Sequence, residues 1–181
     1  TIAEPLKDLK RKAAELLGPV PQRPPGFCIG CPERPVFSAM KLLEKDSGKF
    51  HVSADIGCHL FSTLPPFDLG NTVLGYGLGL ASNSAVNSMF GKRTVSIMGD
   101  GGFWHNGLTT SVANAVFNKD DGILVIMKNG YSSATGTQEL PSSPQHSEWK
   151  SGDMSIENAL AGVGVGWVRT VDNYRVAEVA K

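Results

Sequence analysis

The chain has 181 residues, of which 41% are hydrophobic and 19% are charged. This length and composition are typical of one globular domain with a buried core, and they exclude a disordered chain. Seventeen basic and seventeen acidic residues cancel, so we expect neither a nucleic acid nor a membrane as a partner. No apolar run approaches the roughly 20 residues needed to span a bilayer.

Three cysteines are an odd number and a poor basis for a disulfide framework. We therefore expect a cytoplasmic protein in a reducing compartment. The chain opens with Thr1 rather than Met, and residues 172–181 predict a helix that begins with a cap at Asp172 and then stops. We expect the natural polypeptide to be longer, with the domain truncated at its C-terminus.

The N-terminal region predicts a helix followed by an extended linker. Apolar residues recur at helical spacing from Leu6 to Leu17, and Gly18-Pro19 ends the pattern. Residues 19–26 contain four prolines and predict an extended segment. A second helix is predicted from Pro35, a favourable first-turn residue. We expect residues 1–25 to form this helix and linker, and residues 26–181 to form the main domain.

The centre of the chain alternates predicted strands and helices. Residues 94–98 and Ile123–Met127 are compact β-branched runs typical of buried parallel strands. A helix capped near Asn106 is predicted between them, and a helix over 157–163 precedes a weaker strand over 166–171. This order predicts an α/β fold with an open, mainly parallel sheet and helices on both faces. Such folds bind ligands at the carboxyl ends of the strands.

Two further segments are rich in small or polar residues. Residues 132–155 show no periodicity, and a loop of this length in a compact domain favours a functional role, with a disordered surface excursion as the alternative. Gly75, Gly77 and Gly79 precede a run of small residues. They predict a turn into a helix that packs closely against neighbouring backbone.

The two central strands each end in a loop suited to a metal and a phosphate. The first is followed by Gly99, Asp100, Gly101 and Gly102, and the second by Asn129 after one lysine. Because the carboxyl ends of parallel strands share one edge of a sheet, we expect Asp100 and Asn129 to converge. Carboxylate and amide oxygens suit Mg²⁺, and the glycines and helix N-terminus suit phosphate. Two unrelated turns are the alternative.

The three cysteines form a CxxC pair and a distant single residue. Cys28 and Cys31 precede the predicted Pro35 helix, and Cys58 follows in a short Asp-Ile-Gly-Cys run. This pattern suits an iron–sulfur cluster or zinc, and a disulfide across the pair is the alternative. Three ligands are one short of the four that such a site needs.

Several of these motifs, in this order, resemble those of the indolepyruvate ferredoxin oxidoreductases, which are thiamine diphosphate enzymes. The segment PPGFCIGCPERPVF at residues 24–37 is similar to one signature of that family, and residues 55–58 are similar to the next. The stretch GDGGFWHNGLTTSVANAVFNK at 99–119 is similar to its magnesium loop and following helix. The stretch NGYSSATGTQ at 129–138 is similar to its second ligand loop.

The resemblance implies oxidative decarboxylation of indolepyruvate or another aryl pyruvate to an acyl-coenzyme A, with electrons passed to ferredoxin. It implies that Asp100, Asn129 and the carbonyl of Tyr131 hold Mg²⁺. It also implies that the three cysteines ligate a [4Fe–4S] cluster, whose fourth ligand we expect past residue 181. The residues implied to contact the cofactor are Gly57, Cys58, Gly99, Asp100, Gly101, Gly102, Asn129, Tyr131 and Ala134.

Two features of the resemblance bear on the reaction. Pyruvate-specific relatives have Asn at the position of Ala134, and a small apolar side chain there leaves room for an aromatic ring. The glutamate that activates the cofactor lies on a pyrimidine-binding domain, elsewhere in the polypeptide or on another subunit. We therefore expect an oligomer, and no turnover by this chain alone.

His59 and His105 are candidates for proton transfer by residue type, although hydrogen-bonded structural histidines are the more common case. Two other functions remain open. One is a thiamine diphosphate-dependent decarboxylase or synthase without a cluster. The other is a zinc-stabilised interaction module without catalysis.

Overall fold

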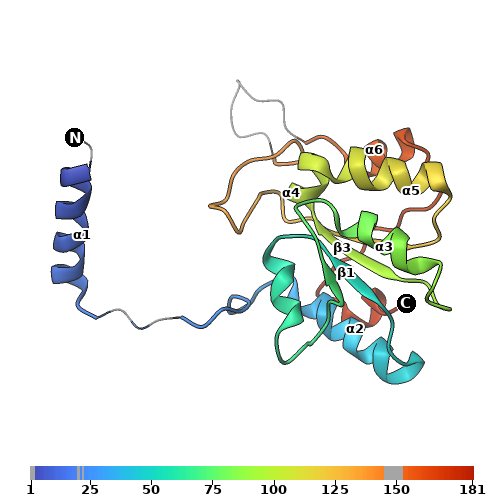
Figure 1. Cartoon of the computed structure of the whole chain (residues 1–181), viewed down its shortest axis with the longest axis horizontal. Coiled ribbons are helices and arrows are strands. Elements are labelled where there is room, and N and C mark those ends of the chain that lie inside the picture. Colours follow the sequence, from blue (N-terminus) through green and yellow to red (C-terminus); the bar gives the residue numbers. More distant parts are fainter. Residues whose placement is uncertain (1–2, 20, 22, 145–152) are drawn as a thin grey trace.

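The computed structural model describes residues 3–19, 21, 23–144 and 153–181. Four parallel strands form one sheet in the order β2-β1-β3-β4 (Figure 1). They are β1 Val52–Ala54, β2 Thr72–Val73, β3 Val95–Gly99 and β4 Ile123–Met127. The predicted open parallel sheet is confirmed, and both predicted central strands are present to within one residue.

Helix α2, Arg34–Ser47, covers one face of the sheet. It carries a proline in its first turn, as the sequence predicts, and that residue costs the helix no hydrogen bond there. Its side chains Val36, Phe37 and Met40 are buried against residues of β1 and β3. The short helix α7, Val176–Val179, lies on the same face, where Val179 packs against this core.

Three helices and a π-helix cover the opposite face (Figure 1). They are α3 Gly79–Asn87, the π-helix η2 Phe103–Val112, α5 Ala113–Asn118 and α6 Ile156–Gly162. Their core includes Phe103, Val112 and Leu160, packed with Met98 of the sheet. Helices therefore lie on both faces, as predicted.

Helix α1, Ala3–Leu17, confirms the predicted N-terminal helix and ends before Gly18, which has a φ of 63°. None of its residues is buried, and Figure 1 shows it apart from the sheet. Among the described residues, no helix is long and apolar enough to cross a membrane.

The helix after β3 begins earlier than the sequence predicts. Its first turn, α4, spans Asp100–Gly102, and it continues through η2 into α5, so Asn106 lies inside the helix instead of capping it. Gly99 precedes it in an extended conformation, with φ −77° and ψ 157°. The glycines suggested a loop, but Gly102 is helical, and glycine is required there because an added Cβ would overlap the Asp55 carboxylate.

Two predictions for the C-terminal region are wrong. Residues 166–171 are not a strand, and none of them is paired with another described strand. The helix predicted over 172–181 is reduced to α7, because Asp172 closes a turn by accepting the Tyr174 N–H at 3.0 Å. The first difference has a structural cause, since a strand needs a neighbour with which to form its hydrogen bonds.

Candidate functional site

The two loops predicted to bind the metal meet at the carboxyl edge of the sheet. Oδ2 of Asp100 accepts the backbone N–H of Asn129 at 3.0 Å and that of Gly130 at 2.7 Å. Its Oδ1 accepts the N–H of Gly101 at 3.0 Å. The predicted convergence of Asp100 and Asn129 is therefore present, and the hydrogen bonds fix both loops relative to one carboxylate.

Burial raises the pKa of Asp100, because its side chain is only 2% exposed and its charged form loses water. The N–H groups of Gly130, Asn129 and Gly101 offset part of this rise. No basic side chain is among the groups that shift this pKa. A divalent cation at this place would favour the ionised carboxylate, as expected for a metal ligand.

The second loop turns sharply after Asn129. The Asn129 Oδ1 accepts the backbone N–H of Tyr131 at 3.2 Å, and Gly130 has a φ of 84°. The amide nitrogen of Asn129 donates to Ser133 Oγ at 3.5 Å. The amide oxygen retains a lone pair that could bind a metal. Of the three residues expected to supply oxygen ligands, Asn129 and Tyr131 thus lie in one short turn, and Asp100 lies at the start of helix α4.

Gly101 lies in a closely packed part of this edge. A Cβ at this position would overlap the hydroxyls of Tyr76 and Ser132, which are joined by a 2.7 Å hydrogen bond. Ser132 is held in turn by two backbone hydrogen bonds to Gln138, of 2.9 and 3.2 Å. Hard oxygen donors beside glycine backbone suit both Mg²⁺ and a diphosphate. The residues present therefore fit the predicted cofactor.

A buried ion pair that the sequence does not reveal lies next to Gly102. Asp55, which is 0% exposed, pairs through Oδ1 with Nε2 of His59. Its Oδ2 accepts the N–H of Gly77 at 2.8 Å. A Cβ at Gly77 would lie 2.6 Å from the Gly102 carbonyl oxygen. Asp55 thus holds the turn at Gly77 against the segment that contains Gly102. This agrees with the close backbone packing predicted for that turn.

His59 is a structural member of this cluster. Burial alone would lower the pKa of His59, but the hydrogen bond and charge of Asp55, with the charge of Glu33, raise it overall. Burial raises the pKa of Glu33, whose Oε2 has no hydrogen-bond partner. The His59 side chain is 2% exposed. The ion pair with Asp55 favours the structural interpretation of this histidine over proton transfer.

The cysteines lie in two separate segments. Cys28 and Cys31 share one turn, in which the Cys31 N–H donates to the Cys28 carbonyl at 3.2 Å. Cys58 opens the 3₁₀-helix η1, Cys58–Thr63, and its Sγ lies 3.4 Å from Ser133 Oγ in the second loop. All three thiols are free, so the disulfide alternative is not realised. Burial raises the pKa of Cys31.

In the part of the chain that the structure describes, no group of three or more His, Cys, Asp or Glu side chains is arranged to hold a metal ion. The three cysteines alone therefore do not form a complete cluster site. This result does not test the three expected magnesium ligands, because only one of them, Asp100, is a His, Cys, Asp or Glu residue.

The remaining predicted residues lie around the same edge. The His105 ring packs against Tyr76 at 5.0 Å between centroids, above the first loop. Ala134 is exposed in the second loop. Gly57 is extended before η1, and an added Cβ would lie 3.0 Å from Nδ1 of His59. The part of the long loop at residues 145–152 lies outside the described residues.

The family of thiamine pyrophosphate enzymes, represented by its C-terminal TPP binding domain, matches residues 55–181. The chain belongs to this family. The match includes both loops predicted to bind the metal, and it favours the two thiamine-dependent functions over a zinc-stabilised module.

Curated relatives are similar over most of this chain. The indolepyruvate oxidoreductase subunit IorA of Methanothermobacter thermautotrophicus is 30% identical over 167 residues, which are 90% of this chain and 27% of the relative. The IorA subunit of Thermococcus kodakarensis is 31% identical over 172 residues, 87% of this chain and 26% of the relative. The chain thus spans about a quarter of the length of these relatives.

A solved structure shares the fold. It is the 2-oxoglutarate:ferredoxin oxidoreductase from Magnetococcus marinus with 2-oxoglutarate, coenzyme A and succinyl-CoA bound. It superposes with a TM-score of 0.71 at 18% identity, over 88% of this chain and 58% of that chain. This similarity confirms the fold of a thiamine pyrophosphate-binding domain.

Proposed function

We propose that this chain is the cofactor-binding part of a 2-oxoacid:ferredoxin oxidoreductase that converts indolepyruvate or a related aryl pyruvate to its acyl-coenzyme A. The observation that carries the proposal is the pair of hydrogen bonds from Asn129 and Gly130 to Asp100. They hold the Asp100 carboxylate against the backbone of Asn129 and Gly130, in a fold of the matching family. The similarity to IorA subunits supports the aryl substrate.

The residues of this chain bind and orient the cofactor. In this proposal Asp100, Asn129 and the carbonyl of Tyr131 would hold Mg²⁺, and the start of the helix at Asp100–Gly102 would face the diphosphate. Bound thiamine diphosphate supplies the electron sink for decarboxylation of a 2-oxoacid. The buried Asp55–His59 pair keeps the glycine turn and first loop in place, so that the ligands do not have to reorganise on binding.

The substrate ring would lie beside the second loop. Ala134 is small and exposed there, which leaves space where a polar amide would otherwise project. We expect Ala134→Asn to lower the ratio of kcat/KM for an aryl pyruvate to kcat/KM for pyruvate in the complete enzyme. A change of about 10-fold is the size expected for one pocket contact. An unchanged ratio would remove Ala134 from the substrate site.

Electron transfer requires parts outside residues 1–181. In this proposal Cys28, Cys31 and Cys58 are joined by a fourth ligand elsewhere to hold a [4Fe–4S] cluster that reduces ferredoxin. Coenzyme A accepts the acyl group, and a pyrimidine-binding domain supplies the activating glutamate. The placement of Cys58 against the second loop supports this arrangement, because it puts a thiol next to the cofactor-binding residues.

Calorimetric titration of Mg²⁺ and thiamine diphosphate into the full-length polypeptide tests the site. Asp100→Ala should abolish measurable binding, since it removes both the charge and the acceptor for two N–H groups. Asp121→Ala is the matched control, because that exposed carboxylate lies just before the opposite end of β4. Equal affinity in wild type and Asp100→Ala would refute the assignment.

A thiamine diphosphate-dependent decarboxylase or synthase without a cluster is the second candidate. It is favoured by the lack of any complete metal-binding group among the His, Cys, Asp and Glu residues that the structure describes. Iron and sulfide analysis of the anaerobically purified full-length protein separates the two. About four iron atoms per chain support the oxidoreductase, and their absence supports the decarboxylase.

A further inference from the structure

The Ser133 hydroxyl lies between two residues that the proposed function uses for different purposes. Asn129 is a proposed magnesium ligand, and its amide nitrogen donates to Ser133 Oγ at 3.5 Å. Cys58 is a proposed cluster ligand, and its Sγ lies 3.4 Å from the same oxygen, although 75 residues separate it from Ser133 in the sequence. Ser133 is not among the residues that the family resemblance implies to contact the cofactor. Its hydroxyl therefore joins two sites without belonging to either.

The two contacts use different parts of this hydroxyl. The Asn129 amide nitrogen carries only hydrogens to give, so Ser133 Oγ accepts there. A metal-bound cysteine sulfur carries no proton, so the single proton of Ser133 is donated to Cys58. The order of donation is therefore Asn129 to Ser133 to Cys58. Hydrogen bonds in such a chain polarise one another, so that a change at one end alters the strength of the bond at the other.

The contact with Ser133 also sets the direction in which the Asn129 amide faces. Its Nδ2 donates to Ser133, while its Oδ1 accepts the Tyr131 N–H at 3.2 Å. Removing the Ser133 hydroxyl leaves only one of these two bonds to oppose rotation of the amide. A rotated amide would present nitrogen, whose two hydrogens prevent it from binding Mg²⁺. Ser133 thus acts on the proposed ligand in the way that hydrogen-bond partners orient metal ligands elsewhere.

The backbone that carries Ser133 is fixed by its own loop. Ser132 and Gln138 exchange two backbone hydrogen bonds, of 2.9 and 3.2 Å, which close the loop around Ser133. The Gly136 N–H donates to the Ser133 carbonyl at 3.3 Å. The Ser132 hydroxyl is joined to Tyr76 at 2.7 Å, which anchors the loop to the glycine turn. The position of Ser133 therefore does not depend on the two residues that its hydroxyl connects.

Cys58 is fixed from the opposite side. Gly57 directly precedes it, and a Cβ at Gly57 would lie 2.5 Å from the ring of His59, which directly follows it. That ring is held in turn by its ion pair with the buried Asp55. The backbone on both sides of Cys58 is therefore closely packed, and the sulfur meets the Ser133 hydroxyl from a rigid support.

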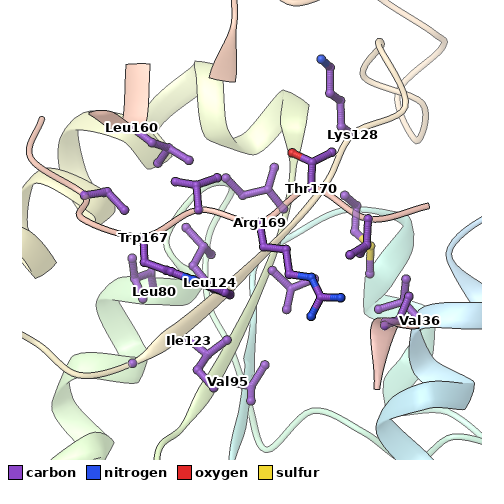
Figure 2. Close-up of a pocket in the computed structure, with 18 of the residues that line it drawn as sticks. Val36, Leu80, Val95, Ile123, Leu124, Lys128, Leu160, Trp167, Arg169 and Thr170 are labelled. Carbon is purple, nitrogen blue, oxygen red and sulfur yellow. The ribbon is translucent and has the colours of Figure 1, made fainter. Parts of the chain in front are cut away.

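The contact is separate from the large hollow beside β4. Figure 2 shows that hollow, of about 1300 Å³, with Leu124 of β4 and with Lys128, which directly follows the strand. Asn129 also lines the hollow, but neither Ser133 nor Cys58 does. The connection through Ser133 is therefore a feature of the metal-binding edge, and it does not depend on what fills the hollow.

We propose that Ser133 is a positioning residue that couples the magnesium ligand Asn129 to the sulfur of Cys58 through one hydroxyl. This inference rests on the proposed function. Mg²⁺ on Oδ1 of Asn129 makes the Nδ2–H group a stronger donor, which strengthens the bond from Ser133 to the sulfur. A hydrogen bond to a cluster sulfur favours the reduced cluster, because that state carries more negative charge. Binding of Mg²⁺ with thiamine diphosphate therefore raises the reduction potential of the cluster.

Ser133→Ala in the full-length polypeptide tests both contacts. Calorimetry should show about a fivefold loss of affinity for Mg²⁺ with thiamine diphosphate, the size expected for one hydrogen bond. Redox titration followed by electron paramagnetic resonance should show a lower cluster potential with the cofactor bound. A fivefold change in that equilibrium is about 40 mV for one electron. The rise in potential that the cofactor causes in wild type should also be lost.

Two further variants serve as controls. Ser133→Thr keeps the hydroxyl and should restore both the affinity and the potential. Thr135→Ala removes a hydroxyl of the same loop, one that donates to Gln138 at 2.7 Å, and should change neither. Wild-type affinity and potential in Ser133→Ala would overturn the proposal. Loss of only one of the two would also overturn it, because a single hydroxyl is assigned both contacts.

Failure of the proposed function gives a different result. A full-length protein without iron would refute the oxidoreductase, and the connection is then measured in that protein by a double-mutant cycle. The losses of cofactor affinity caused by Ser133→Ala and Cys58→Ala should be smaller together than their sum, since the two residues share one bond. Additive losses would overturn the coupling.

Discussion

Gly130, in the loop after β4, donates its backbone N–H at 2.7 Å to the carboxylate of Asp100, which begins helix α4 after the neighbouring strand β3. We assign Asp100 two tasks. Its carboxylate holds the second loop in place through this bond, and in the proposed function it also supplies negative charge to Mg²⁺.

Asp100→Asn separates these two tasks. The amide can still accept one backbone N–H, but it has no charge with which to bind a divalent ion. We expect the full-length polypeptide to keep its circular dichroism spectrum while its affinity for Mg²⁺ with thiamine diphosphate falls at least about 100-fold. Calorimetry measures the affinity. Retention of wild-type affinity by the asparagine variant would mean that the carboxylate is purely structural.

Gly77→Ala should destabilise the domain strongly. Gly77 has a φ of 82°, and an added Cβ would lie 2.6 Å from the Gly102 carbonyl oxygen and 2.7 Å from the Gly107 nitrogen. The strained backbone and the displaced helix together should lower the free energy of unfolding by about 3 kcal/mol. Denaturant titration measures the change. Gly26→Ala is the control, because nothing lies within 4 Å of its added Cβ and its effect should be small.

The buried Asp55–His59 pair predicts a dependence of stability on pH. The pKa of His59 is raised above its ordinary value of 6.5 in the folded protein. The stability that it contributes is therefore full below about pH 6.5 and is lost as the pH rises through the folded pKa. The difference in unfolding free energy between wild type and His59→Gln should shrink over that window. A difference that grows with pH would contradict a protonated His59.

Tyr76→Phe tests the contact between the glycine turn and the second ligand loop. It removes the hydroxyl that shares a 2.7 Å hydrogen bond with Ser132, a contribution of about 1 kcal/mol. We expect affinity for Mg²⁺ with thiamine diphosphate to fall about fivefold, with little loss of fold stability. Tyr174→Phe serves as the control, since that tyrosine is exposed and lies outside the site. Equal losses in both variants would count against the role of Tyr76.

The sequence predicted those helices and strands that a short run of neighbouring residues determines. The sequence of β4 and of most of β3 is apolar and rich in β-branched residues, and α2 has a proline in its first turn. The convergence of Asp100 and Asn129 also followed from sequence, because one crossover between parallel strands places both loop tips at one edge.

The elements that the sequence missed depend on distant partners. β1 and β2 have three and two residues, too few for a periodic pattern, and they are strands because neighbours pair with them. Residues 166–171 are the converse case. Their residue pattern suits a strand, but none of the described strands pairs with them. The sequence places Asp55 in the Asp-Ile-Gly-Cys run but does not reveal its role, because its partners His59 and Gly77 meet it only in the folded chain.

The base of the long loop after β4 is closed by its own hydrogen bonds. Ser143 donates its hydroxyl to the Gly130 carbonyl, and its own carbonyl accepts the Asp153 N–H at 2.8 Å. The Met154 N–H donates to Pro141 at 3.0 Å. With both stems clamped, residues could be added or removed between Ser143 and Asp153 at small entropic cost. A change in length between Ser143 and Asp153 would therefore leave the turn at Gly130 held by the same hydrogen bonds.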